Sequence, residues 1–276
     1  MIDRLHGLLE HFELRARLFQ AGALCHASSF DADDRLGYIH VMRSGSMIIE
    51  TDAQATHLVD DPCLLFYMNS TSHRLIPQSD GAETFCASFE FGTGLQHPLR
   101  QALPNLILVK LADMPMLNLS LNLLFQEATE QGCGQQAILD RMMEIIIVQL
   151  LRNLMNQKRL QSGLLAGLAE PRLAKAIQAI HTQPGHAWSV ETLATVAGMS
   201  RARFAASFST IVGLTPGGYL SEWRIGIAQT LLRRGKPLQS IASAVGYGSA
   251  SALSRAFSAQ LGLSPKEWLK RDCASA

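Results

Sequence analysis

The sequence lacks the features that would place a protein in a membrane or in an oxidising compartment. Its longest apolar stretch, "EIIIVQLL" at 144–151, is far shorter than the ~18 residues that a membrane-spanning helix requires. The N-terminal twenty residues contain three acidic side chains and no signal-peptide core. Five cysteines, an odd number without the spacing of metal ligands, are typical of reduced thiols. We therefore expect a cytoplasmic protein with no membrane partner.

The sequence is also poor in the motifs of catalysis. The 276 residues show no nucleophile triad, no phosphate-cradling glycine loop and no paired-carboxylate site. We therefore expect no catalytic residue and no cofactor, and predict that the chain is not an enzyme.

Positive charge is scarce in the first part of the chain and concentrated at its end. Residues 1–170 hold 12 Lys and Arg against 19 Asp and Glu, whereas residues 171–276 hold 12 against 4. The net charges of −7 and +8 almost cancel in the formal total of +1. A basic C-terminal third beside an acidic remainder favours a polyanionic partner for one end only, and nucleic acid is the obvious candidate.

Hydrophobic periodicity predicts two domains of different class. Residues 20–95 contain short apolar runs separated by turn residues, as in a small β-sandwich or barrel. From 118 onward the period becomes helical, with an apolar stripe from Leu139 to Leu154. Glycines and a proline in "QSGLLAGLAEP" favour a linker. We predict an α+β chain with a sensor domain at 1–160, a linker at 161–170 and an all-α domain at 171–276.

The C-terminal third repeats itself. The stretch "TLATVAGMSRARFAASFSTIVGLTPGGYL" at 192–220 returns as "SIASAVGYGSASALSRAFSAQLGLSPKEWL" at 240–269. Each copy has the requirements of a helix-turn-helix: a small residue (Ala194, Ala242) for close crossing and, four positions on, a glycine for the turn. Ser200 and Ser249 are expected to cap the second helix of each copy. The repeat predicts two helix-turn-helix units, and the weaker alternative is a helical bundle that binds no DNA.

The second helix of each copy carries the residues that we expect to contact DNA. Its outward positions are short or basic, which lets a helix approach base edges in the major groove. The segment from Pro216 to Arg234 is expected to form one helix of roughly 27 Å, comparable to the ~34 Å between successive major grooves. The predicted DNA-binding residues are Arg201, Ala202, Arg203, Ala205 and Ala206 in the first copy, and Ala250, Ser251, Ala252, Ser254 and Arg255 in the second.

Segment 171–270 resembles the DNA-binding domain of the AraC/XylS family of bacterial transcription regulators. The resemblance lies in "IASAVGYGSASALSRAFSAQLGLSPKEW", "WSVETLATVAGMSRARFAASF" and "YLSEWRIGIAQTLL". It implies a sequence-specific regulator of promoter DNA, more often an activator, with RNA polymerase as a further partner. Arg255 is the best candidate for a base contact, since a guanidinium bridges guanine O6 and N7. Arg201 and Arg203 are expected to contact phosphates, the alternative being a solvated face.

Residues 20–160 resemble the cupin-type sensor domain that some of these regulators carry. The resemblance implies a β-barrel that receives a small molecule or an oxidant, and dimerisation through the helices after it. The stripe from Leu139 to Leu154 would supply the dimer face, or else pack on its own barrel. His40 and His73 are the candidate effector-pocket residues, with His73 expected inside and its neighbours exposed. No His-x-His pair is present, so we expect no metal site.

Two cysteines suggest a redox switch. Cys25 and Cys86 lie in about the places where thiols occur in family members that respond to hypochlorous acid. That resemblance implies a sulfenic acid or a Cys25–Cys86 disulfide that shifts the barrel. The alternatives are that both thiols are small apolar fillers, that the chain is a chemical-damage sensor with a sacrificial cysteine, or that it is a cupin metalloenzyme fused to a DNA-targeting module.

Overall fold

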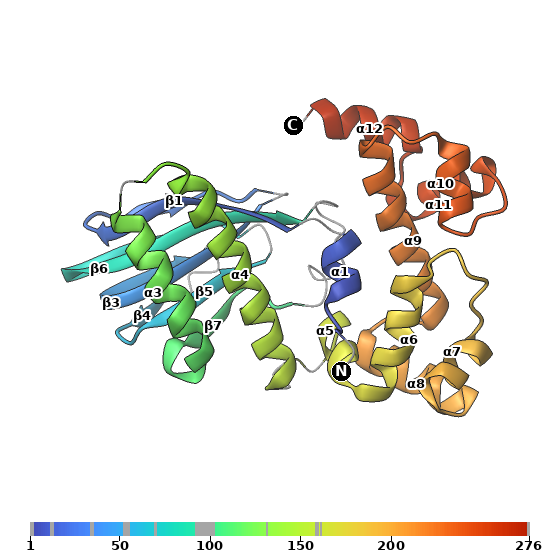
Figure 1. Cartoon of the computed structure of the whole chain (residues 1–276), viewed down its shortest axis with the longest axis horizontal. Coiled ribbons are helices and arrows are strands. Elements are labelled where there is room, and N and C mark those ends of the chain that lie inside the picture. Colours follow the sequence, from blue (N-terminus) through green and yellow to red (C-terminus); the bar gives the residue numbers. More distant parts are fainter. Residues whose placement is uncertain are drawn as a thin grey trace. The chain divides into compact units, whose positions relative to one another are not determined.

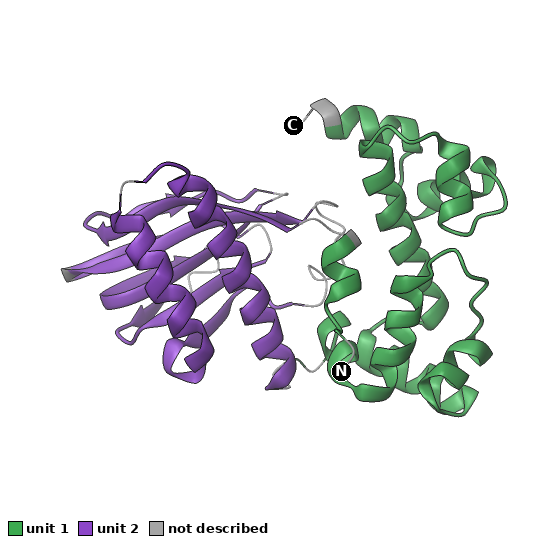
Figure 2. Cartoon of the chain, in the orientation of Figure 1, with its two compact units in different colours: residues 1–13, 96–102, 158–276 green, residues 14–95, 103–157 purple. Residues whose placement is uncertain are grey.

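The computed structural model describes residues 3–11, 14–33, 36–51, 56–68, 71–91, 103–130, 132–157, 160 and 162–274. The chain divides into two compact units (Figure 2). The first, called here the sensor unit, comprises residues 14–95 and 103–157; the second, the helical unit, comprises 1–13, 96–102 and 158–276. The first residue of the predicted linker, 161, lies outside the described residues.

The sensor unit is built on a seven-stranded sheet with two helices beside it (Figure 1). The hydrogen-bonded order is β1-β6-β3-β5-β7, with β2 paired to β6 and β4 paired to β3. All pairs are antiparallel. The strands are β1 (Leu14–Leu24), β2 (Ser28–Phe30), β3 (Gly37–Thr51), β4 (Thr56–Val59), β5 (Cys63–Tyr67), β6 (His73–Phe91) and β7 (Ile107–Lys110). A short 3-10 turn, η2 (Leu111–Asp113), follows them.

Two long strands replace the uniformly short strands that the sequence predicts. β3 and β6 run for 15 and 19 residues and pair along most of their lengths, with register shifts between Met42 and Ser44 and between Gly45 and Met47. Gly45 has φ +86°, and a Cβ atom there would overlap the carbonyl oxygen of Gly81. Both glycines therefore let the strands bend past each other instead of ending them. The bend brings the two halves of the sheet around one apolar interior.

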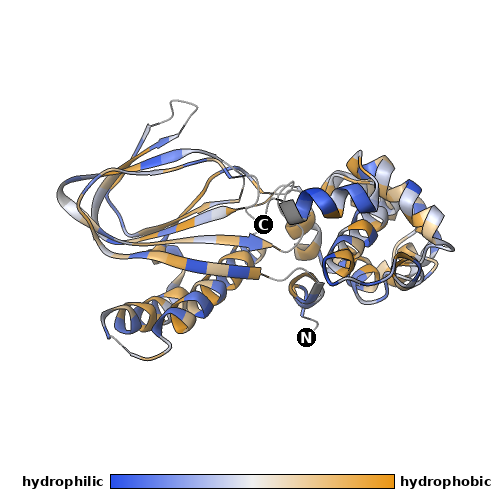
Figure 3. Ribbon diagram, turned by 90° about the horizontal axis from the view of Figure 1, so that it is seen from above, coloured by the Kyte–Doolittle hydropathy of each residue, from blue (hydrophilic) through white to orange (hydrophobic). Residues whose placement is uncertain are grey.

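Helices α3 (Pro115–Thr129) and α4 (Gln135–Asn156) pack against each other, and α4 also packs against β1. The stripe predicted as a dimer face is buried inside the unit: Leu139, Ile146 and Leu154 are 6%, 0% and 2% exposed. The first prediction for this stripe is therefore wrong, and the alternative, packing on its own sheet, is correct. Both helices retain apolar residues on their other faces, and polar and apolar residues alternate along them (Figure 3).

The helical unit contains two helix-turn-helix pairs, with one long helix between them in the sequence. Its elements are α1 (His6–His11), α5 (Leu164–Ala169), α6 (Pro171–Thr182), α7 (Val190–Ala197), α8 (Arg201–Val212), α9 (Pro216–Arg233), α10 (Leu238–Ala244), α11 (Ala250–Leu261) and α12 (Pro265–Ala274). The two aromatic corners match: Phe208 lies 5.7 Å from Tyr219, and Phe257 lies 5.8 Å from Trp268, both edge-on. The predicted helix-turn-helix duplication and the α+β class are confirmed.

The N-terminal helix and the predicted linker both belong to the core of the helical unit. The guanidinium of Arg4 donates to the carbonyl oxygens of Leu168 and Ala169, and the amide of Gln178 donates to the Asp3 carbonyl. The linker segment contains α5, whose residues 164–168 are buried against α6 and α8. Gly167 serves close packing, since a Cβ there would lie 2.8 Å from Ile177 and from Val212.

Candidate nucleic-acid interface and sensor interior

The turn of each helix-turn-helix unit has the same backbone geometry. Gly198 has φ +62° and Gly246 has φ +78°, the left-handed conformation that glycine adopts without strain. In the first turn the N–H of Met199 donates to the Ala194 carbonyl at 2.9 Å, and in the second Tyr247 donates to Ala242 at 2.8 Å. These bonds close the preceding helix by its last free carbonyls. The second copy has one residue more than the first, Gly248, and this residue lies after the turn, just before α11 begins.

The first reading helix, α8, presents short side chains and two arginines. Phe204 and Phe208 are fully buried on its inner face. Of the predicted contact residues, Arg201, Ala202, Arg203 and Ala206 are exposed and Ala205 is partly exposed. Exposure fits the predicted role in DNA contact, which stays a prediction.

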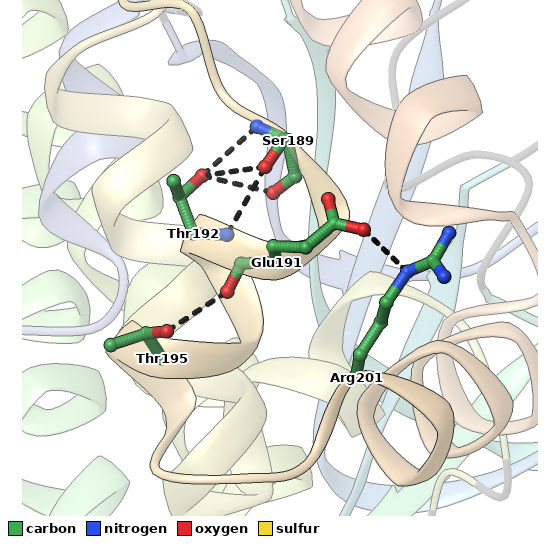
Figure 4. A network of polar contacts seen from close by, with 5 residues as sticks. All are labelled: Ser189, Glu191, Thr192, Thr195 and Arg201. Atoms are coloured by element: carbon green, nitrogen blue, oxygen red, sulfur yellow. Dashed lines mark hydrogen bonds and ion pairs between the residues drawn. The ribbon is translucent and has the colours of Figure 1, made fainter.

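Arg201 has a partner that sequence reasoning missed. Its Nε lies 2.5 Å from Oε1 of Glu191 on α7 (Figure 4). The capping box of Ser189 and Thr192 begins α7 and places Glu191 in its first turn. The pair is well exposed, so it costs little to exchange Glu191 for a phosphate oxygen. Arg203 forms no ion pair with any described residue and is available without such an exchange.

The second reading helix, α11, has a more firmly built N-terminus. The hydroxyl of Ser249 accepts from the N–H of Ala252, and the side-chain carbonyl of Gln239 accepts from the N–H of Ala250. Gln239 was not predicted as a cap, because it is remote in sequence and reaches α11 only through the turn. The remaining predicted contacts follow: Ser251 and Arg255 are exposed, and Ala250, Ala252 and Ser254 are partly exposed.

Most acidic side chains near the reading helices are already engaged within the helical unit. Glu191 pairs with Arg201, and Asp272 accepts two hydrogen bonds from Arg233 at 2.8 Å. Glu267 accepts from the N–H of Ser264 at the start of α12, and the Ser264 side chain lowers its pKa. Few unpaired carboxylates therefore remain beside the surplus of Lys and Arg in 171–276. A surface of this kind attracts a polyanion.

In the sensor interior, His40 and His73 form a hydrogen-bonded pair. Both are buried, and their Nε2 atoms lie 2.8 Å apart. The Thr71 carbonyl accepts from Nδ1 of His73, so in the neutral pair Nε2 of His40 donates to Nε2 of His73. Nδ1 of His40 is then a buried acceptor without a hydrogen-bond partner in the described part of the chain. Burial, and secondarily His73, hold the pKa of His40 well below its ordinary value.

Aromatic rings surround the histidine pair. His73 stacks on Tyr67 at 3.8 Å and on Phe30 at 4.9 Å, and Tyr38 lies edge-on to it. His40, expected to be exposed, lies inside this group because its strand position faces the interior. The structure therefore brings the two predicted effector-pocket residues into contact. Among the described residues, no group of three or more His, Cys, Asp or Glu side chains is arranged to hold a metal ion.

The structure does not bring Cys25 and Cys86 together. Cys86 is buried on β6 opposite Gln20, whereas Cys25 follows Leu24, which pairs with Ala82. The four strand positions between Ala82 and Cys86 span roughly 13 Å, more than the 4.4–6.8 Å that separates disulfide-bonded Cα atoms. A direct Cys25–Cys86 disulfide is therefore excluded in this conformation. Burial raises the pKa of Cys86 to about 12, which opposes thiolate formation, while Cys25 is exposed.

Comparison with known families agrees with both halves of the structure. A cupin family model matches residues 3–156, and a helix-turn-helix domain model matches residues 193–271. The chain thus combines a cupin domain with a duplicated helix-turn-helix domain. It belongs to the AraC/XylS family of regulators with an N-terminal cupin domain.

Individual relatives carry names of the same kind. A putative AraC-like transcription regulator of Streptomyces lividans is 39% identical over 198 residues, 70% of this chain and 65% of the relative. The RCS-specific activator RclR of Escherichia coli is 36% identical over 147 residues, 53% of this chain and 52% of RclR. The chain thus spans about two thirds or less of these relatives. The DNA-binding domain of AdpA, solved with a target DNA, is 31% identical with a TM-score of 0.35, over 38% of this chain and 95% of that domain.

Proposed function

We propose that this protein is a sequence-specific, DNA-binding transcription regulator whose sensor unit responds to a small molecule or an oxidant. The observation that carries the proposal is the pair of matching turns, which present two helices with short and basic outward residues at the two ends of α9. An α-helix with such a face fits the major groove. None of the described helices is long and apolar enough to cross a membrane. We propose that the protein acts in the cytoplasm on promoter DNA, with RNA polymerase as partner.

Arg255 tests the reading of bases. Its guanidinium is exposed and forms no ion pair with any described residue, so it is free to bridge a guanine. Arg255→Ala should weaken binding to a duplex selected from a random pool by the wild-type protein by about 1–3 kcal/mol. Lys270→Ala, which removes one exposed positive charge from α12, is the control. An equal loss on selected and random duplexes for Arg255→Ala would show that this residue reads no base.

The charge distribution makes a second test possible. Each phosphate that the helical unit neutralises releases a counterion, so affinity should fall steeply as salt rises. Binding of the full chain to duplex DNA is measured by fluorescence anisotropy between about 50 and 200 mM salt, where several phosphate contacts predict a loss of several orders of magnitude. A salt-independent affinity would contradict a nucleic-acid interface on this surface.

We propose Cys25 as the reactive thiol if the effector is an oxidant. It is exposed, as an oxidant sensor requires, and the relative RclR is named an RCS-specific activator. Cys25→Ser should then abolish the change in DNA binding that hypochlorous acid causes, while the buried Cys86→Ser should have a smaller effect. A response that survives Cys25→Ser would favour a small-molecule effector in the interior around His40 and His73.

We propose that the protein is a homodimer and an activator. The stripe from Leu139 to Leu154 is buried, but α3 and α4 expose other apolar residues. On α3, Met116, Leu119 and Leu123 are 79%, 67% and 50% exposed, and they recur at helical spacing. Ile138 and Ile145 are similarly exposed on α4. Large exposed apolar side chains grouped in this way are typical of interfaces.

A further inference from the structure

Arg224 joins the central helix to a loop of the first helix-turn-helix unit. It lies in the middle of α9, and its guanidinium makes two hydrogen bonds to the loop that precedes α7. Nε donates to the Pro184 carbonyl at 2.7 Å, and Nη2 donates to the His186 carbonyl at 2.8 Å. A planar guanidinium that donates to two carbonyls holds both of them in direction as well as in distance.

The same loop contacts the turn of the second helix-turn-helix unit. A Cβ atom built on Gly185 would lie 2.9 Å from the Ala244 carbonyl oxygen, and one built on Gly246 would lie 2.6 Å from the Gly185 carbonyl oxygen. Arg224 closes the group, because its guanidinium carbon lies 5.7 Å from the ring centre of Tyr247. Backbone of the first unit and backbone of the second therefore meet without room for a side chain.

We propose that Arg224 and Gly185 form an interlock that fixes the spacing between the two reading helices. This inference rests on the proposed DNA binding. Apart from the interlock, α8 and α11 both pack on α9, each by its own apolar face. With it, the loop before α7 is held against the α10–α11 turn, so α8 and α11 approach DNA as one rigid body. Arg224 is thus a positioning residue that sets specificity for half-site spacing without touching a base.

The dimensions of DNA show how strictly the interlock should discriminate between half-site spacings. Inserting one base pair between two half-sites moves them apart by about 3.4 Å and rotates one against the other by about 34°. Hydrogen bonds of 2.7 and 2.8 Å do not survive such a displacement. The wild-type protein should therefore accept one spacing, and the loss on adding or removing one base pair should be at least about tenfold, the effect of a mismatched base pair.

The experiment selects duplexes from a random pool with full-length wild-type protein and with Arg224→Ala, and sequences both sets. Wild type should yield two half-motifs at a single spacing. Arg224→Ala should yield the same half-motifs at several spacings, with affinities on the wild-type, +1 and −1 duplexes that differ by less than about threefold. Arg224→Lys keeps the charge but cannot hold two carbonyls in a plane, so it should relax the spacing as well.

Gly185→Ala provides an independent variant, since its methyl group would push the loop away from Ala244 and leave the α9 side chain intact. Gly217→Ala is the matched control, because a Cβ there meets no atom within 4 Å. Thermal melts establish that each variant is folded. A single spacing retained by both Arg224→Ala and Gly185→Ala overturns the inference. So does a uniform loss at every spacing that Arg224→Lys restores, which would mark a phosphate contact. A wild-type selection without any motif would instead refute the proposed function.

Discussion

The buried histidine pair makes the stability of the sensor unit depend on pH with a predictable sign. His40 has a folded-state pKa well below its ordinary value of 6.5 because it is buried beside His73. Near pH 6.5, His40 therefore binds a proton in the unfolded chain but stays neutral in the folded chain. The free energy of unfolding falls as the pH falls below that value. Above pH 6.5 both states are neutral, and this contribution does not change.

The size of the effect follows from one proton. Between pH 7.5 and 5.5 a histidine that titrates only in the unfolded state removes about 1.4 kcal/mol of stability. For a unit of this size that corresponds to a fall of roughly 5 °C in the melting temperature. Unfolding of the sensor unit is measured by calorimetry of the full chain. Tryptophan fluorescence would not report on this unit, because Trp188, Trp223 and Trp268, the three tryptophans of the sequence, lie in the helical unit.

A pair of variants separates His40 from the other titrating groups. His40→Gln keeps a side-chain donor for His73 but removes the titration, so the slope of melting temperature against pH should become smaller. His57→Gln, at an exposed position of β4, should leave the slope as in the wild type. If His40→Gln retained the full wild-type slope, the assignment of the pH dependence to the buried pair would be refuted.

Three further changes have expected outcomes. Gly45→Ala combines a left-handed φ with overlap on the Gly81 carbonyl, so chemical denaturation should show a loss well above that of Gly22→Ala, which has φ +107° but no atom within 4 Å of its Cβ and should cost about 1–2 kcal/mol. Equal losses would show that no close approach exists at Gly45. Leu119→Glu should shift the protein toward monomer in sedimentation, whereas Leu58→Glu, an equally exposed change on β4, should not. Arg4→Ala should raise hydrogen exchange in α1 by removing two bonds worth about 1–3 kcal/mol each; unchanged exchange would show that these bonds do not hold the helix.

The fold of the helical unit could be predicted closely, because the residues that determine it are close together in the sequence and occur in both copies of the repeat. Gly198 and Gly246 have the left-handed conformation that a turn of this kind demands, and Phe208 and Phe257 lie on the buried face that the helical period indicates. Pro171 and Pro216 each begin a helix, as their fixed φ and missing N–H favour. Spacing between a few residues was enough, since each of these features depends on neighbours within one or two turns.

In the sensor unit, sequence patterns identified elements but not what they face. An apolar stripe on α4 can pack equally well on a sheet of its own chain and on a second molecule of the protein. The folded unit shows that this stripe packs on its own sheet. Gly45 and Gly81 resemble strand-ending turn residues until their close approach is seen. The sequence allowed a Cys25–Cys86 disulfide to be predicted, because the register of β1 on β6, which separates the two thiols, cannot be seen in the sequence.

By itself the sequence determined the duplicated helix-turn-helix, its basic charge and the α+β division, because helix periodicity, turn chemistry and charge are properties of short segments. Of the two predicted caps, the Ser249 side chain caps α11, whereas the Ser200 side chain makes no cap hydrogen bond to α8. Tertiary structure alone decided which apolar face is free, that α1 packs on α6, that His40 meets His73, and that Arg224 reaches the loop before α7. These contacts join residues about 30 to 175 positions apart, and no local pattern encodes a distance that depends on how the whole chain is folded.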